Sequence, residues 1–246
     1  MSGHSKWATI KHAKGAADAK RGQVFTKLIK EISIAARMGG GNPDANPRLR
    51  TAILKARGAN MPKDNIERAI KKGTGELEGV NYEELAYEAY APGGVAVIIE
   101  VLTDNKNRAA ADIRNILTKA GGELATSGAA SRLFKRQGVI ILDGEKYTED
   151  QVMEAALEGG AEDVSASDGI IEVTSAPEDF ESVLNALQEK NFETTSAQVS
   201  MVAEAEVTLD NEGTAKVLRL IDKLEENDDV QNVYTNIAVP EDYEAA

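Results

Sequence analysis

The feature that most constrains this chain is the uneven distribution of charge along it. Residues 1–74 contain 16 Lys and Arg but only 5 Asp and Glu, which gives that segment a net charge of +11. The whole chain has 28 basic and 41 acidic residues, so the remainder has 12 basic and 36 acidic residues and a net charge of −24. The sequence therefore consists of two unlike parts, a basic one followed by an acidic one.

Such asymmetry indicates an anionic partner, with the basic segment making the contact. The alternative is internal, because oppositely charged parts of one chain can dock on each other. The first 22 residues are too polar to pack into a core, which favours a basic region that faces solvent. The overall net charge of −13 hides this feature.

Composition narrows the class of protein further. A chain of 246 residues with 42% hydrophobic and 28% charged content is globular. The absence of cysteine excludes disulfides, thiolate zinc sites, iron–sulfur clusters and a cysteine nucleophile. No stretch approaches the roughly 20 apolar residues of a membrane helix, and the first residues lack the apolar core of a signal peptide. We expect a cytoplasmic protein with no membrane partner.

The basic part is expected to be an arm followed by a helical bundle. Residues 1–22 show no sustained apolar period and predict a flexible basic arm. Residues 23–74 form a helical basic domain, in which helical spacing begins at Phe25, Asn46-Pro47 starts a second helix and Pro62 a third. In the first helix the cations fall on one arc, away from the apolar side chains, and are Lys20, Lys27, Lys30 and Arg37.

The acidic part predicts two α+β units. From Gly138 the elements follow the order βαββαβ, the ferredoxin-like motif. The capping boxes Thr148 with Gln151 and Ser175 with Glu178 are expected to start its helices. The elements before and after this motif complete each other in a discontinuous domain. The fold class is thus α+β multidomain: an N-terminal basic helical bundle followed by two ferredoxin-like α+β sandwich domains, one inserted in the other, with residues 80–134 plus 206–246 in the discontinuous domain and 135–205 in the inserted one.

The sequence offers little support for catalysis. The two histidines, His4 and His12, lie in the polar arm, where nothing excludes water or fixes a tautomer. Nucleotide-binding, zinc-protease and serine-hydrolase motifs are absent from the sequence. Acidic neighbours such as Asp228-Asp229 are expected to be solvated surface, because adjacent side chains point apart. We expect a non-enzymatic protein with no cofactor and no metal.

The arm and bundle carry the candidate site. A Lys-rich arm beside a helical basic face can reach successive phosphates. Trp7 can stack on a base or pack against its own bundle, and both interpretations stay open. The residues expected to contact nucleic acid are Lys6, Trp7, Lys11, His12, Lys14, Lys20, Arg21, Lys27, Lys30, Arg48, Arg50, Lys55 and Arg57.

Several segments of this sequence resemble the YebC family. The matching motifs run in order along most of the chain and are Gly3 to Trp7, Asp18 to Gly22, Gly39 to Arg50, Tyr90 to Gly94, Thr103 to Arg108, Glu154 to Asp163 and Asp228 to Gln231. The resemblance implies a bacterial cytosolic protein of three domains, described in the family as a probable transcriptional regulator that binds DNA. A mitochondrial relative is a translational activator, and some bacterial members are ribosome-associated.

We therefore expect a DNA-binding transcriptional regulator that grips phosphates with its basic arm and helices. The rival hypothesis is a translation factor that binds ribosomal RNA. A third is an interaction scaffold without nucleic acid, in which the basic segment makes protein contacts. A protein partner on the acidic domains is compatible with each.

Overall fold

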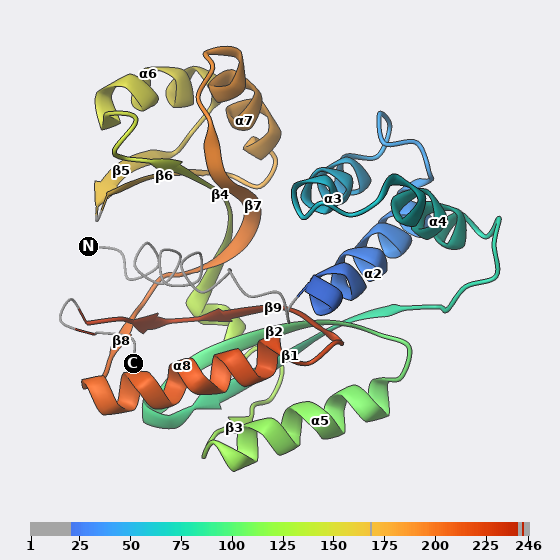
Figure 1. Ribbon diagram of the computed structural model, residues 1–246. Helices are drawn as coiled ribbons and strands as arrows, with labels where there is room; N and C mark the ends of the chain where they lie inside the picture. The colour runs from blue at the N-terminus through green and yellow to red at the C-terminus, as the bar shows by residue number, and fades with distance from the viewer. Residues whose placement is uncertain (1–20, 168, 241–242, 244–246) are drawn as a thin grey trace.

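The computed structural model describes residues 21–167, 169–240 and 243 (Figure 1). The chain forms a helical domain, a central α+β domain and a second α+β domain, and the helical and second α+β domains both adjoin the central one (Figure 1). The second is built from the middle of the chain. We call it the inserted domain, because the central sheet includes strands from both sides of it in the sequence.

The helical domain contains three helices around a core of Ile, Leu and Ala side chains. Asn46 begins the second helix by accepting a hydrogen bond from the Leu49 amide at 3.1 Å, as its N-cap position predicts. The first and third helices cross closely at Gly73, where a Cβ would lie 2.2 Å from the Ser33 carbonyl oxygen. The helices are α2 (Arg21–Gly39), α3 (Pro47–Gly58) and α4 (Lys63–Thr74).

The central domain packs two helices on one face of an antiparallel sheet (Figure 1). Its second strand is apolar at nearly every position and is buried, as the continuous Val and Ile run predicts. The sheet order is β3-β1-β2-β9, and the elements are β1 (Glu83–Ala91), η2 (Pro92–Gly94), β2 (Val95–Thr103), α5 (Lys106–Lys119), β3 (Glu123–Leu124), α8 (Asn211–Glu225) and β9 (Val230–Thr235).

The inserted domain repeats this architecture with its own core. Its sheet order is β5-β6-β4-β7, and every neighbouring pair is antiparallel. The elements are β4 (Phe134–Asp143), α6 (Glu149–Gly159), β5 (Asp163–Ser167), β6 (Ile170–Ser175), α7 (Phe180–Glu189) and β7 (Thr194–Ala203). Two short segments, β8 (Val207–Thr208) and β10 (Ile237–Ala238), pair in parallel, and η3 (Ser131–Leu133) precedes β4.

The two four-stranded sheets differ in the order in which the chain forms their neighbouring strands. The inserted sheet has the connectivity of the ferredoxin-like motif. In the central sheet β1, the first strand along the chain, occupies the place that β6 holds in the inserted sheet. The multidomain α+β class expected from the sequence is confirmed.

Helix caps were predicted with mixed success. The capping box of Thr148 and Gln151 is present at the start of α6. The capping box of Ser175 and Glu178 is wrong, because α7 begins only at Phe180. The Ser175 hydroxyl instead donates to the Ala176 carbonyl at 3.0 Å, at the end of strand β6.

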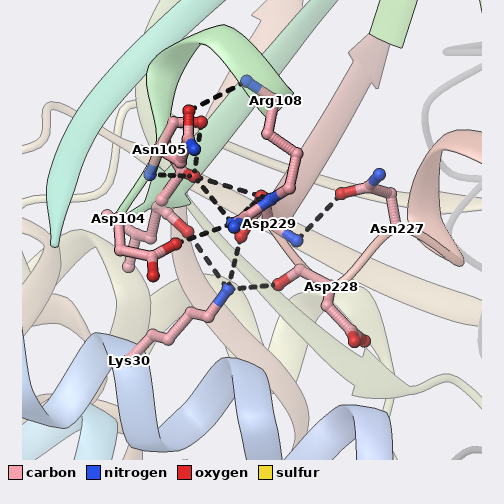
Figure 2. Close-up of polar contacts among 9 residues, drawn as sticks. Lys30, Asp104, Asn105, Arg108, Asn227, Asp228 and Asp229 are labelled. Atoms are coloured by element: carbon pink, nitrogen blue, oxygen red, sulfur yellow. Dashed lines mark hydrogen bonds and ion pairs between the residues drawn. The ribbon is translucent and has the colours of Figure 1, made fainter. Parts of the chain in front are cut away.

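A buried ion pair joins the helical domain to the central domain (Figure 2). The Lys30 Nζ on α2 lies 2.7 Å from Asp229 Oδ1, and the two side chains are 8% and 6% exposed. The same ammonium donates to the carbonyl oxygens of Leu102 at 3.3 Å and Asp228 at 2.9 Å. These three acceptors match the three donors of the ammonium group.

The other oxygen of Asp229 is held from within the central domain (Figure 2). Oδ2 of Asp229 accepts one hydrogen bond from Arg108 Nη2 at 2.8 Å and another from Thr103 Oγ1 at 3.1 Å. Burial alone would raise the pKa of Asp229, but the hydrogen bonds from Lys30 and Arg108 outweigh it and lower the pKa below its usual value. The carboxylate is thus charged at neutral pH and tied to both domains. The expectation that the Asp228-Asp229 pair is solvated surface is wrong for Asp229.

Replacement of Asp229 by Ala is expected to destabilise the protein by about 3–5 kcal/mol, because it leaves the buried Lys30 ammonium without its counter-charge. Asp228→Ala is the matched control, because that side chain is exposed and forms no ion pair or hydrogen bond with the described residues, and it is the backbone oxygen of Asp228 that accepts from Lys30. Denaturant unfolding of both variants measures the difference. Equal loss of stability in the two would contradict the assigned role of the Asp229 carboxylate.

The stabilisation by Asp229 should also depend on pH with a defined sign. A carboxyl group whose pKa is lowered in the folded state stabilises it above the unfolded pKa, about 3.9, and loses that contribution as the pH falls through the folded pKa. The difference in unfolding free energy between the natural chain and Asp229→Ala should therefore be constant from about pH 5 to 7 and shrink below about pH 4. A difference that grows on acidification would contradict the assignment.

Candidate nucleic-acid interface

Six of the predicted site residues belong to the arm and lie outside the described residues. They are Lys6, Trp7, Lys11, His12, Lys14 and Lys20. Arg21 begins α2, and its side chain also lies outside the description. The remaining predicted residues lie on α2 and α3.

The prediction that α2 presents a free cationic face is wrong for Lys27, Lys30 and Arg37, the cations whose side chains the structure describes. Lys27 Nζ donates to the Glu225 carbonyl at 2.6 Å, at the C-terminal end of α8. Lys30 is buried in the ion pair with Asp229. Arg37 donates to the Tyr82 carbonyl in the segment that leads into β1. This polar arc faces the central domain. On α2, therefore, the alternative that the basic and acidic parts of the chain dock on each other is the one that the structure shows.

The contact at the end of α8 has an electrostatic cause. The last carbonyls of a helix have no intrahelical partner and carry a partial negative charge. Lys27 binds the carbonyl of Glu225, and Gln23 Nε2 donates to the carbonyl of Glu226 at 3.0 Å. Two polar side chains of α2 thus satisfy the open end of a helix in another domain.

Arg48 is engaged by two carboxylates. Its guanidinium donates to Glu31 on α2, with Nε at 2.7 Å and Nη2 at 3.1 Å, and to Glu84 on β1. Burial alone would lower the pKa of Arg48, but the hydrogen bonds to Glu31 and Glu84 raise it above the ordinary value. The group holds α3 against its neighbours.

Arg50 and Lys55 on α3 reach the inserted domain. Arg50 Nη2 lies 3.0 Å from Glu181 Oε2 on α7, and Lys55 Nζ lies 3.4 Å from Gln198 Oε1 on β7. Both contacts are open to water. Arg57, at the C-terminal end of α3, is exposed and makes no ion pair among the described residues.

Helix α4 presents cations that the sequence reasoning did not include in the site. Arg68, Lys71 and Lys72 are exposed, and none forms an ion pair or a side-chain hydrogen bond within the described part of the chain. They lie on the side of α4 away from the buried Ile66 and Ala69. The signal was available in the sequence, because spacings of three and four residues place side chains on one helix face.

This set of free cations suits a polyanion. Neighbouring side chains on one helix face have Cβ atoms about 5–6 Å apart, so three long cations can address adjacent phosphates. Lysine and arginine that are not already paired can replace the counterions of a nucleic acid without first breaking a protein contact. The exposed, unpaired cations among the described residues are Arg57 on α3 and Arg68, Lys71 and Lys72 on α4. Helix α3 also carries Arg50 and Lys55, whose contacts with the inserted domain are open to water.

Other kinds of site find little support in the described ranges. No cluster of three or more His, Asp or Glu side chains there could hold a metal ion. No helix in those ranges is long and apolar enough to cross a membrane. A cavity of about 350 Å³ between α2, α4 and the segment before β1 is lined by Ile29, Ser33, Lys72, Val80 and Tyr82, among others.

Similar proteins from other bacteria are described as regulators. A "probable transcriptional regulatory protein" of Treponema denticola is 69% identical over 244 residues, 99% of each chain. A protein of Treponema pallidum with the same description is 65% identical over 240 residues, 98% of each chain. These descriptions are those of regulatory proteins rather than enzymes.

Structure and family comparisons agree with this relationship. The crystal structure of a conserved hypothetical protein from Aquifex aeolicus matches with a TM-score of 0.85 and 46% identity, over 93% of this chain and 95% of that one. The model of the TACO1/YebC N-terminal domain matches residues 5–76, and the model of the TACO1/YebC second and third domain matches residues 82–237. The chain belongs to the TACO1/YebC family.

Proposed function

We propose that this chain is a DNA-binding transcriptional regulator that holds phosphates with its basic arm and with the exposed cations of α3 and α4. One observation carries the proposal: Arg57, Arg68, Lys71 and Lys72 are exposed and unpaired among the described residues. The other described cations of the bundle each contact an acceptor within the chain; they are Lys27, Lys30, Arg37, Arg48, Arg50, Lys55 and Lys63. The four cations that carry the proposal remain unpaired among the described residues, although the neighbouring domains are rich in carboxylates. Their positive charge is therefore available to a polyanion.

The acidic domains orient the nucleic acid by repulsion. The chain after residue 74 carries a net charge of −24, so its surface opposes the approach of phosphates. The arm and the bundle carry +11 and are the only part of the sequence with a positive balance of this size. Binding should therefore be confined to one end of the molecule.

The contacts are proposed to be with the backbone rather than with bases. Reading of base edges in DNA uses Arg, Asn and Gln side chains that converge on one groove. The exposed face of α4 offers one Arg and two Lys, which suit phosphates. Sequence preference, where present, would arise from DNA shape.

The relatives' description supports transcription as the process that is regulated. The alternative is a translation factor that binds ribosomal RNA, since phosphate contacts of this kind do not distinguish the two polymers. The proposal is of a binding protein rather than an enzyme, in line with the relatives' description as regulatory proteins.

The triple substitution Arg68→Ala, Lys71→Ala and Lys72→Ala should weaken binding nearly equally across sequences. Each lost phosphate contact flattens the slope of log affinity against log salt by about 0.7 to 0.9, so the total change should be about 2 to 3. Fluorescence anisotropy of the full chain with mixed-sequence duplex DNA, and separately with a ribosomal RNA hairpin, measures both affinity and slope.

The matched control removes three exposed cations from the central domain, Arg114→Ala, Lys119→Ala and Arg219→Ala. It changes the net charge equally and should leave the slope intact. An unchanged slope in the α4 variant would contradict the interface, whereas tighter binding of the RNA hairpin than of the duplex at equal salt would favour the translation alternative.

A further inference from the structure

The helical domain and the inserted domain face each other through α3. Arg50 on α3 donates to both carboxylate oxygens of Glu181 on α7, at 3.1 and 3.0 Å. Lys55 on the same helix lies 3.4 Å from Gln198 on β7. Figure 1 shows α3 beside α7 and β7. These contacts cover part of the basic surface proposed above.

This contact is weak by comparison with the joint to the central domain. The Arg50 and Glu181 side chains are 38% and 43% exposed, whereas Lys30 and Asp229 are 8% and 6% exposed. Leu54, between Arg50 and Lys55 in the sequence of α3, is 56% exposed, so this apolar side chain does not seal the polar contacts from water. An exposed ion pair of this kind contributes little to stability and weakens further with salt.

The pair joins parts of opposite charge. Residues 135–205 contain 4 basic and 16 acidic residues, a net charge of −12. Glu181 therefore brings a carboxylate from an acidic domain to a cation on the basic bundle. The Glu181 carboxylate accepts hydrogen bonds from the Arg50 guanidinium, as phosphate oxygens would.

We propose that Glu181 is an internal competitor for nucleic acid: the inserted domain closes on α3 through Arg50, and a phosphate displaces it. The proposal rests on the proposed function and adds its regulation. Engagement of Arg50 by a phosphate then moves the inserted domain away from α3, while the Lys30–Asp229 pair keeps the bundle fixed on the central domain.

Release of Glu181 from Arg50 costs little on either side. Glu181 lies in the first turn of α7, where the helix dipole stabilises a carboxylate without a cation. Arg50 stays in place, because its Nη1 donates to the carbonyl oxygens of Pro43 at 3.2 Å and Asp44 at 3.4 Å. The guanidinium keeps Nη2 free for a phosphate oxygen.

The test compares Glu181→Gln with Glu178→Gln in the full chain. Both remove one negative charge next to the start of α7, but Glu178 is exposed and makes no ion pair among the described residues. Glu181→Gln should bind a mixed-sequence duplex DNA up to about fivefold more tightly than the natural chain at low salt, the range set by an exposed pair. Glu178→Gln should change the affinity much less.

A distance measurement supplies the second readout. The chain has no cysteine, so Met38→Cys and Leu157→Cys, at sites 65% and 56% exposed, allow one dye on the bundle and one on the inserted domain. Energy transfer between the dyes should fall when saturating duplex DNA is added. It should already be lower in Glu181→Gln before any DNA is added.

The outcomes separate the two proposals. Tighter binding by Glu181→Gln together with reduced transfer supports the competitor. If the natural chain binds DNA but Glu181→Gln and Glu178→Gln bind alike, or transfer stays constant at saturation, the competitor is overturned and the proposed function stands. If the natural chain binds neither DNA nor RNA, both are overturned.

Discussion

The buried pair of Lys30 and Asp229 fixes how the basic and acidic parts of this chain meet. Removing two charges from water is costly, and the cost is met only when every donor and acceptor is satisfied. Here the ammonium has three acceptors, and the carboxylate has Lys30 on one oxygen and Arg108 and Thr103 on the other. Because this geometry admits few alternatives, α2 is oriented on the central domain, and α3 and α4 follow from it.

That orientation divides the cations of the bundle into two groups. On α2, Lys27 and Lys30 are turned toward the central domain, and Arg37 reaches the segment before β1. On α4, Arg68, Lys71 and Lys72 are left facing water. The net charge of +11 therefore overstates what is available to a partner, and the position of each cation matters more than the sum.

Much of the fold could be predicted from periodicity, because the buried stripes of α2 and α8 and the apolar run of β2 are local signals. The fate of Lys30 could not, since helical spacing shows that a side chain leaves the core of its own domain but not what covers it. Two of the family motifs, Thr103 to Arg108 and Asp228 to Gln231, pointed to the partner of Lys30. They supply Thr103, Arg108 and Asp229, which form one hydrogen-bonded network in the structure. Similarly, Ser175 with Glu178 satisfied a capping pattern, but the strand extended through Ser175 and the helix began later.

Lysine-reactivity footprinting with and without DNA tests the central claim, that the fold uses one group of cations and leaves another for the ligand. Reductive methylation followed by mass spectrometry should find Lys30 unreactive throughout. Lys71 and Lys72 should react in the free protein and be protected by duplex DNA, while the exposed Lys119 of the central domain reacts equally in both states. Ready modification of Lys30 in the free protein, or no protection of Lys71 and Lys72 at saturating DNA, would contradict the account.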